Sequence, residues 1–167
     1  VCYLQEDYQA MAKAAQKAIE IEEGNAMAQY LLGRAKQGMD DGLMSIAHLT
    51  KAIVLKDDFT EARLLRAEAL TKMKQYNEAM EDIDAILAQD ADDESALLLR
   101  GKIKEATGDA GAAEADYCHV TELNPFNEQG FLYLGQLYIE QKKLPEAIAL
   151  FDEAIELNPN FAQASVS

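Results

Sequence analysis

Small and bulky apolar residues recur along this chain with a fixed period. A small residue returns every 34 positions, at Gly33, Ala67, Gly101 and Gly135. A second small column follows twelve residues later, at Ser45, Ala79, Ala113 and Ala147. Four residues further on lies a bulky column, at Leu49, Ile83, Tyr117 and Phe151. Because spacings of 3 and 4 residues keep side chains on one helical face, the period predicts stacked pairs of antiparallel helices.

Residues that break helices divide the chain at regular points. Asn124-Pro125 and Asn158-Pro159 each close a row, since proline cannot continue a helix and biases the preceding residue away from the α region. We expect helices over 7–22, 26–38, 43–56, 60–73, 77–89, 94–106, 110–123, 128–141 and 145–157. Residues 1–6 are expected to be the remnant of an earlier helix. No segment alternates like a strand, so the sequence predicts an all-α fold.

The columns resemble those of a known repeat family. The row from Glu128 to Phe161 resembles a tetratricopeptide repeat (TPR), with the family's positions held by Phe131, Leu134, Gly135, Tyr138, Ala147, Phe151, Ala154 and Pro159. The row from Glu94 keeps most of them, at Leu97, Gly101, Ala113, Tyr117, Val120 and Pro125. The two earlier rows keep the small and apolar columns but lack the closing proline. The resemblance implies a right-handed superhelical solenoid of antiparallel helix hairpins, an α-α superhelix.

The register divides the chain into repeats. We expect a single TPR array over residues 1–167, with a partial repeat over 1–25, full repeats over 26–59, 60–93, 94–127 and 128–161, and the start of a further helix over 162–167. Tyr8, Met11 and Ala15 align with the second helix of a preceding row. Neither end carries the polar cap that a solenoid needs, so we expect a segment of a longer protein, or a chain with trimmed ends.

A pair of columns covaries within the chain. Arginine precedes the small column at Arg66 and Arg100, and aspartate stands sixteen residues later at Asp82 and Asp116. In the other two rows leucine takes the first position, and the later residue is His48 or Leu150. Since the two helices of a hairpin bring these positions together, we predict the ion pairs Arg66–Asp82 and Arg100–Asp116. Coincidence in two rows of four is the alternative.

Function is expected on the first helix of each pair, which by resemblance to the family lines a concave groove. The expected groove residues are Tyr30, Leu31, Arg34, Leu64, Leu65, Glu68, Leu98, Leu99, Lys102, Leu132, Tyr133 and Gln136, with Gln37, Lys72 and Glu105 among the sides. We expect exposure for Leu31, Leu65, Leu99 and Tyr133. The preceding residues, Tyr30, Leu64, Leu98 and Leu132, either open to the groove or pack between neighbouring first helices.

One binding mode of the family is disfavoured. Some members hold the terminal carboxylate of a chaperone peptide with lysine, asparagine and arginine from three first helices. The matching positions here read Tyr30, Arg34, Leu65, Ser95 and Leu99, or in the next register Leu64, Glu68, Leu99, Gln129 and Tyr133. Neither set forms that clamp, and only Arg34 could serve an anionic ligand.

Charge restricts the partners. The chain carries 15 basic and 30 acidic residues, a formal charge of −15, which repels nucleic acid and anionic membrane surfaces. No apolar run approaches the roughly 20 residues that span a bilayer. Acidic clusters such as residues 90–94 are interpreted as a solvated convex face, with a docking site for a basic partner as the alternative. The two cysteines, Cys2 and Cys118, form no metal-type pair and favour a reduced cytoplasm, while the compartment stays unknown.

Catalysis finds little support in the sequence. Cys118 and His119 are neighbours and project about 100° apart on a helix, so they cannot readily hydrogen-bond. Asp116 and His119 share a face but lack further metal ligands. We therefore expect no enzyme, no cofactor and no metal. The sequence favours an interaction scaffold that binds a protein or peptide in its groove. The alternatives are a structural or oligomerisation module that acts through its ends, and an accessory array of an enzyme or sensor.

The uncapped ends generate a prediction. Terminal helices that lack a dedicated polar cap should self-associate as the protein concentration rises. Light scattering or native mass spectrometry should detect dimers or larger species. A strict monomer at high concentration would argue against adhesive ends.

Overall fold

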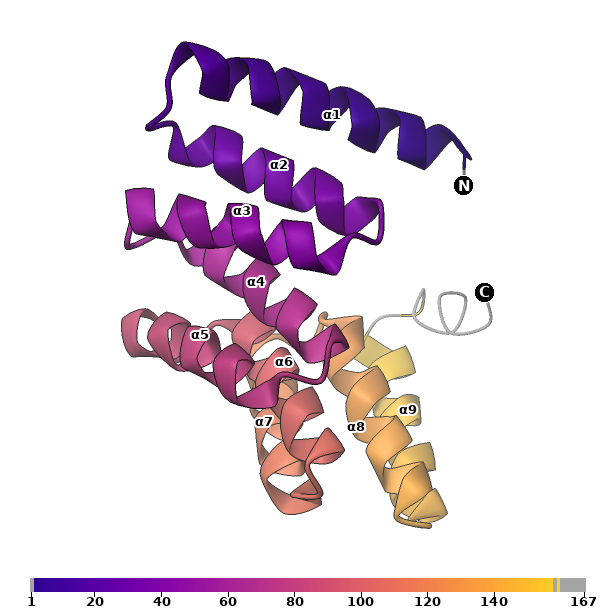
Figure 1. Cartoon of the computed structure of the whole chain (residues 1–167). Coiled ribbons are helices and arrows are strands. Elements are labelled where there is room, and N and C mark those ends of the chain that lie inside the picture. The colour runs from indigo at the N-terminus through magenta and orange to yellow at the C-terminus, as the bar shows by residue number, and fades with distance from the viewer. Residues whose placement is uncertain (1, 158, 160–167) are drawn as a thin grey trace. The chain divides into compact units, whose positions relative to one another are not determined.

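The computed structural model describes residues 2–157 and 159, and these residues form helices and turns (Figure 1). The helices are α1 (Cys2–Ile21), α2 (Ala26–Gly38), α3 (Gly42–Leu55), α4 (Thr60–Lys72), α5 (Tyr76–Gln89), α6 (Glu94–Ala106), α7 (Ala110–Leu123), α8 (Glu128–Glu140) and α9 (Leu144–Leu157). From α2 to α9 each boundary lies within one residue of its prediction. The all-α fold class is confirmed. The expected further helix over 162–167 lies outside the described residues.

The prediction for the first residues is wrong. We expected a break between residues 6 and 7, but α1 runs without interruption from Cys2 to Ile21. The physical reason is that no glycine, proline or asparagine occurs in this stretch, whereas alanine, glutamine and lysine, which favour helix, are frequent. Nothing in the local sequence therefore ends a helix before Gly24.

The chain divides into two compact units. Unit 1 covers residues 1–89, with α1 to α5, and unit 2 covers residues 90–167, with α6 to α9. In unit 1 each helix packs against the next, and α2 also touches α4. In unit 2 the sequence-neighbouring helices pack in the same way. Each unit is thus built from contacts between successive hairpin helices.

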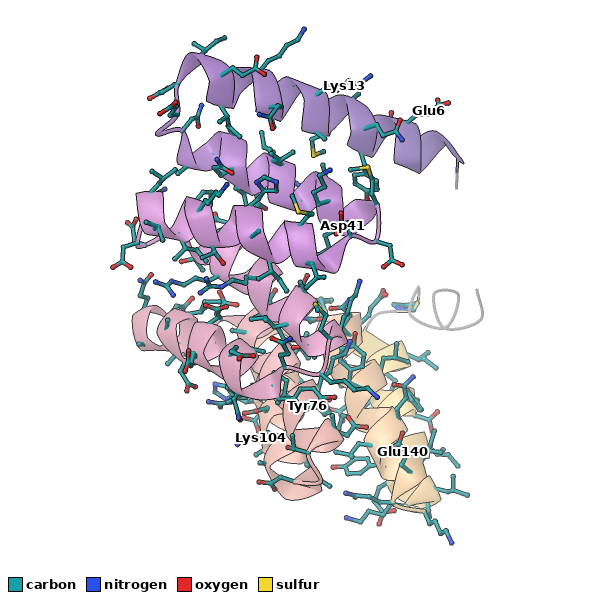
Figure 2. All side chains as sticks on the ribbon, in the orientation of Figure 1. Glu6, Lys13, Asp41, Tyr76, Lys104 and Glu140 are labelled. Atoms are coloured by element: carbon teal, nitrogen blue, oxygen red, sulfur yellow. The ribbon has the colours of Figure 1, made fainter. Side chains whose placement is uncertain are left out.

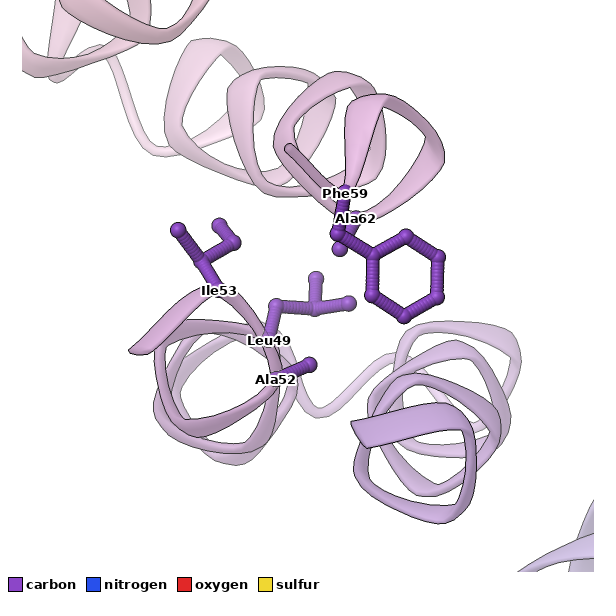
Figure 3. Packing of buried hydrophobic residues seen from close by; sticks show 5 residues of the cluster. All are labelled: Leu49, Ala52, Ile53, Phe59 and Ala62. Atoms are coloured by element: carbon purple, nitrogen blue, oxygen red, sulfur yellow. The ribbon is translucent and has the colours of Figure 1, made fainter. Parts of the chain in front are cut away.

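One core cluster of unit 1 lies where α3 meets α4. Leu49, Ala52, Ile53, Phe59 and Ala62 form one buried cluster (Figure 3). Phe59 occupies the N-cap position of α4 and makes no side-chain cap hydrogen bond, whereas Asn25, Asp93 and Asn127 cap α2, α6 and α8. Apolar burial has replaced a cap at this turn.

The small column sets the distance between the two helices of a hairpin. A Cβ added at Gly33 would lie 2.7 Å from Leu49 Cγ, far inside contact distance. The same addition at Gly101 or Gly135 would overlap the ring of Tyr117 or Phe151, again sixteen residues later. Ala67 and Ile83, the equivalent pair, are both fully buried. The small column therefore lets the bulky column sit directly on the backbone of the first helix.

Both predicted ion pairs are confirmed. Arg66 Nε donates to Asp82 Oδ2 at 2.7 Å, while its Nη2 donates to Oδ1. Arg100 repeats the geometry on Asp116, at 3.0 and 2.7 Å. The carboxylate side chains are only 1% and 8% exposed. Two-point contact with a guanidinium is the arrangement that offsets the cost of burying a carboxylate.

The close contact between Gly101 and Tyr117 predicts that a substitution to alanine destabilises this fold. Gly101→Ala should lower the free energy of unfolding by about 1–3 kcal/mol, because the new methyl group overpacks against the fully buried Tyr117. Gly111→Ala is the matched control, since only Asp109 Oδ1 comes within 4.0 Å of its added Cβ. The control should be neutral or gain up to about 1 kcal/mol from helix propensity. Urea denaturation of both variants checks this, and equal effects would contradict the close approach.

The ion pairs predict that substitutions of both partners have non-additive effects on the free energy of unfolding. Arg66→Leu should cost about 3 kcal/mol, because it leaves the buried Asp82 carboxylate with Arg63 Nη1, at 3.6 Å, as its remaining cation. The double variant Arg66→Leu/Asp82→Leu should recover most of that loss, since Leu134 and Leu150 already occupy these columns in unit 2. A double variant as unstable as the single one, by chemical denaturation, would refute the account.

Candidate functional site

The expected groove residues of unit 1 lie on two helices that touch. Tyr30, Leu31 and Arg34 belong to α2, and Leu64, Leu65 and Glu68 to α4; we call these six the unit 1 groove face. The Tyr30 ring packs on Phe59 with centroids 5.0 Å apart, and Leu65 also borders the core cluster. Leu31, Leu64 and Leu65 are partly exposed, and Arg34 is exposed. Apolar surface thus stays open to solvent beside a cation.

A cavity of about 260 Å³ opens beside this face. Its lining comes from three helices, with Tyr8 from α1, Arg34, Gln37 and Gly38 from α2, and Leu65 and Lys72 from α4. Gln37 and Lys72 also line a second cavity of about 370 Å³, which extends past Ala69 to Met73 and Leu43. The sequence placed Gln37 and Lys72 at the sides of the groove, but Tyr8 was not expected there.

The unit 2 groove residues are less open than predicted. Leu98 and Leu99 of α6 are 5% and 8% exposed, so the expectation of an exposed Leu99 is wrong. Ala96, Leu97, Leu98 and Leu99 are all buried, and consecutive residues project about 100° apart. This turn of α6 is therefore covered on every side. A sequence column reports which residues are apolar but not how completely neighbours enclose them.

The other expected groove residues of unit 2 remain accessible. Leu132 and Tyr133 of α8 are partly buried, and Lys102 and Gln136 are exposed. Lys102 Nζ lies 4.3 Å from the centre of the Tyr133 ring, within cation–π range. The Tyr133 ring in turn lies 5.8 Å from that of Tyr117. We call the six expected groove residues of unit 2 the unit 2 groove face; they are Leu98, Leu99, Lys102, Leu132, Tyr133 and Gln136.

A polar contact beside the unit 2 groove face was not predicted. Tyr117 Oη donates to Glu105 Oε2 at 2.9 Å. Burial, together with this hydrogen bond, raises the pKa of Tyr117. Burial is also the main cause that raises the pKa of Glu105, and the neighbouring Glu140 carboxylate raises it further. The column analysis assigned Tyr117 only a packing role, because its hydroxyl gives no periodic signal.

The chemistry-bearing residues considered in the sequence do not converge. Asp116 is engaged by Arg100, and His119 Nε2 instead lies 3.1 Å from Asp92 Oδ1. Cys118 is a free thiol whose pKa is raised by burial. In the part of the chain that the structure describes, no three histidine, cysteine or acidic side chains gather to bind a metal ion. Over the same residues, no helix has the length and apolar character for crossing a bilayer.

Known proteins resemble this chain in sequence over most of its length. It is 30% identical over 155 residues to the mitochondrial import receptor subunit TOM70 of Rattus norvegicus, covering 89% of this chain and 25% of that protein. It is 21% identical over 133 residues to the probable UDP-N-acetylglucosamine-peptide N-acetylglucosaminyltransferase SPINDLY of Solanum lycopersicum, covering 80% of this chain and 14% of that protein. The chain spans about a quarter or less of the length of these relatives.

Solved structures share the fold. The crystal structure of MamA matches with a TM-score of 0.80 at 19% identity, covering 95% of this chain and 92% of that one. YrrB, described as a TPR protein with an unusual peptide-binding site, matches with a TM-score of 0.71 at 19% identity, covering 97% and 85%. At such identities the likeness concerns the fold.

Three profiles of one repeat family match the chain. Profiles described as tetratricopeptide repeat match residues 45–103, 94–127 and 129–161. Together with the helix hairpins and their 34-residue columns, these matches show that the chain belongs to the tetratricopeptide repeat family.

Proposed function

We propose that this array is a protein-interaction scaffold that binds a peptide or helical segment along its first helices. The observation that carries the proposal is the pair of partly exposed leucines, Leu31 and Leu65, at equivalent positions of the touching helices α2 and α4. Contiguous apolar surface rimmed by polar groups is typical of interaction sites, and an apolar anchor every helical turn or every second residue would suit it. The groove face of unit 1 is therefore the primary candidate surface.

Taken by itself, unit 2 would bind a partner with a different chemistry. Leu98 and Leu99 belong to the proposed groove by their columns, yet they are too enclosed to contact a partner directly. Tyr133, Leu132 and the exposed Lys102 would make the contacts instead, and Gln136 could add a hydrogen bond. An aromatic ring with a cation above it suits a partner side chain that is partly apolar and partly anionic.

The relatives are consistent with an interaction role. TOM70 is named as an import receptor subunit, and YrrB is described as having a peptide-binding site. The formal charge of −15 disfavours nucleic acid and anionic membranes as partners. Tetratricopeptide repeats are in general non-enzymatic scaffolds, and we propose no catalysis for this chain. Within an enzyme or sensor, the array would act as an accessory module.

A second candidate function rests on α9. Leu144, Ile148 and Ile155 are 55%, 60% and 39% exposed, and their spacing places them on one helical face. Such a stripe could join this array to another element or a second copy. In that case the array would act as a structural or oligomerisation module through its end.

Paired substitutions separate the two functions. Leu31→Ser/Leu65→Ser should weaken binding of nonapeptides selected on the unaltered chain by about tenfold or more, because each leucine loses apolar contact area. Val54→Ser, at a side chain 79% exposed on α3, is the control and should bind as before. Fluorescence polarisation gives the affinity and circular dichroism the helicity.

Retained affinity in the leucine variant would remove the groove proposal. If self-association is then lost in Leu144→Ser/Ile148→Ser, the end-joining function takes its place.

A further inference from the structure

The outer side of α3 differs from the outer sides of the later second helices of the hairpins. Leu43, Ala47, Thr50 and Val54 are exposed and follow one another by four, three and four residues, the spacing of a coiled-coil seam. We call these four residues the α3 seam. In each later row the same columns include at least one carboxylate; they hold Asn77, Glu81, Asp84 and Ala88 in α5, Gly111, Ala115, Cys118 and Glu122 in α7, and Pro145, Ala149, Asp152 and Glu156 in α9. The repeat itself therefore does not require the α3 seam to lack charge.

The composition of α3 shows the same departure. This helix contains no aspartate or glutamate, whereas α5, α7 and α9 contain four, three and four of them. The two large side chains of the seam are nevertheless open to solvent, with Leu43 70% and Val54 79% exposed. The buried side of α3 consists of other residues, namely Ser45, Leu49, Ala52 and Ile53. The seam is thus a stripe of apolar surface that the hairpin core does not use, as is typical of a docking site.

A hollow lies on each flank of the α3 seam. Toward α2, a cavity of about 280 Å³ is lined by Glu23, Gln29, Thr50, Lys51, Val54 and Leu55. Toward α5, a cavity of about 300 Å³ is lined by Ile46 and Thr50 of α3, Leu70 of α4, and Glu78 and Glu81 of α5, among others. Figure 2 labels Asp41 at the start of α3 and Tyr76 at the start of α5, and the two helices start on the same side of unit 1. Because Thr50 borders both cavities, the seam forms a ridge between two hollows.

The hollow toward α5 is acidic. Glu78 and Glu81 line it and are exposed. The Arg66 guanidinium also lines it, but it is already engaged by the buried Asp82 carboxylate and donates to Thr50 Oγ1 at 3.2 Å. The charge of the two α5 glutamates is therefore not balanced by this cation. They give one edge of the α3 seam a negative potential.

We propose that the α3 seam docks an amphipathic helix of a partner protein, with an apolar seam of its own and lysine or arginine along one flank. The apolar side chains pack against Leu43, Ala47 and Val54 as knobs into holes. The basic side chains extend over the edge of the ridge and place their charge at Glu78 and Glu81. Charge disfavours a second copy as the occupant, because two chains of −15 repel each other. The surface lies on second helices, so the proposal is independent of the groove faces.

Three synthetic helices of 21 residues test the proposal by fluorescence polarisation at physiological salt. The first, the lysine-flanked helix, has leucine at its a and d positions and lysine on its flanks. The second replaces each lysine by glutamate, and the third replaces each leucine by alanine. The lysine-flanked helix should bind about tenfold or more tightly than either of the others, because it combines both contacts. An alanine helix that binds equally well would show general attraction to an acidic chain and overturn the proposal, as would equal binding of the glutamate helix.

Variants of the apolar ridge locate the binding. Leu43→Gln/Val54→Gln should weaken binding of the lysine-flanked helix by about tenfold, because both side chains lose apolar contact area. Leu144→Gln/Ile148→Gln is the matched control, since it makes the same kind of change at exposed residues of α9, and it should bind as before. Equal loss in the two variants would overturn the proposal. Circular dichroism verifies that both stay helical.

Variants of the acidic edge test the charge. Glu78→Gln/Glu81→Gln should weaken binding of the lysine-flanked helix by about fivefold, as expected for two partly exposed ion pairs. Glu146→Gln/Glu153→Gln removes the same net charge from exposed positions of α9 and should leave the affinity unchanged. An equal effect of the two variants would mean that overall charge, and not this edge, attracts the helix.

The remaining outcomes separate the α3 seam from the groove. In Leu31→Ser/Leu65→Ser the lysine-flanked helix should bind as before, and a loss there would place it in the groove and overturn this proposal. Absence of binding also overturns it, and self-association that disappears in Leu43→Gln/Val54→Gln would then assign the seam to a second copy. Nonapeptides are too short to form a stable helix in water, so Val54→Ser remains a control for groove binding.

Discussion

The structure depends on the contact between a small residue of one helix and a bulky residue sixteen positions later. Gly33, Gly101 and Gly135 leave no room for a Cβ, so Leu49, Tyr117 and Phe151 rest on the backbone of the preceding helix. Close-packed interiors tolerate little change in volume, which makes this contact specific to register as well as to distance. Once it forms, the neighbouring columns of both helices have fixed partners.

The ion pairs and the candidate binding surface follow from that register. Arg66 and Arg100 precede the small column by one residue, and their carboxylates precede the bulky column by one, so each guanidinium reaches its partner. With one face of each first helix used for its hairpin, Leu31 and Leu65 remain partly exposed and Arg34 remains exposed. The surface that could bind a partner is what the packing leaves uncovered.

Most of the fold could be predicted from the sequence because the period repeats each signal several times. The ion pairs were predictable for the same reason, since two rows changed both columns together. Leu99 was mispredicted because its burial depends on how neighbours enclose α6, and α1 was mispredicted because a helix boundary was expected without any residue to impose it. The cavity could not be predicted, since Tyr8, Gln37 and Lys72 meet only through the packing of three helices.

The central claim is that partners bind on the first helices. It is tested most directly by methyl NMR of the chain titrated with the tightest-binding of the selected nonapeptides. The account predicts that the methyl signals of Leu31 and Leu65 shift on binding, while that of Val54, on the exposed side of α3, does not. Shifts at Val54 or at Ile148 of α9, with Leu31 and Leu65 unchanged, would contradict it.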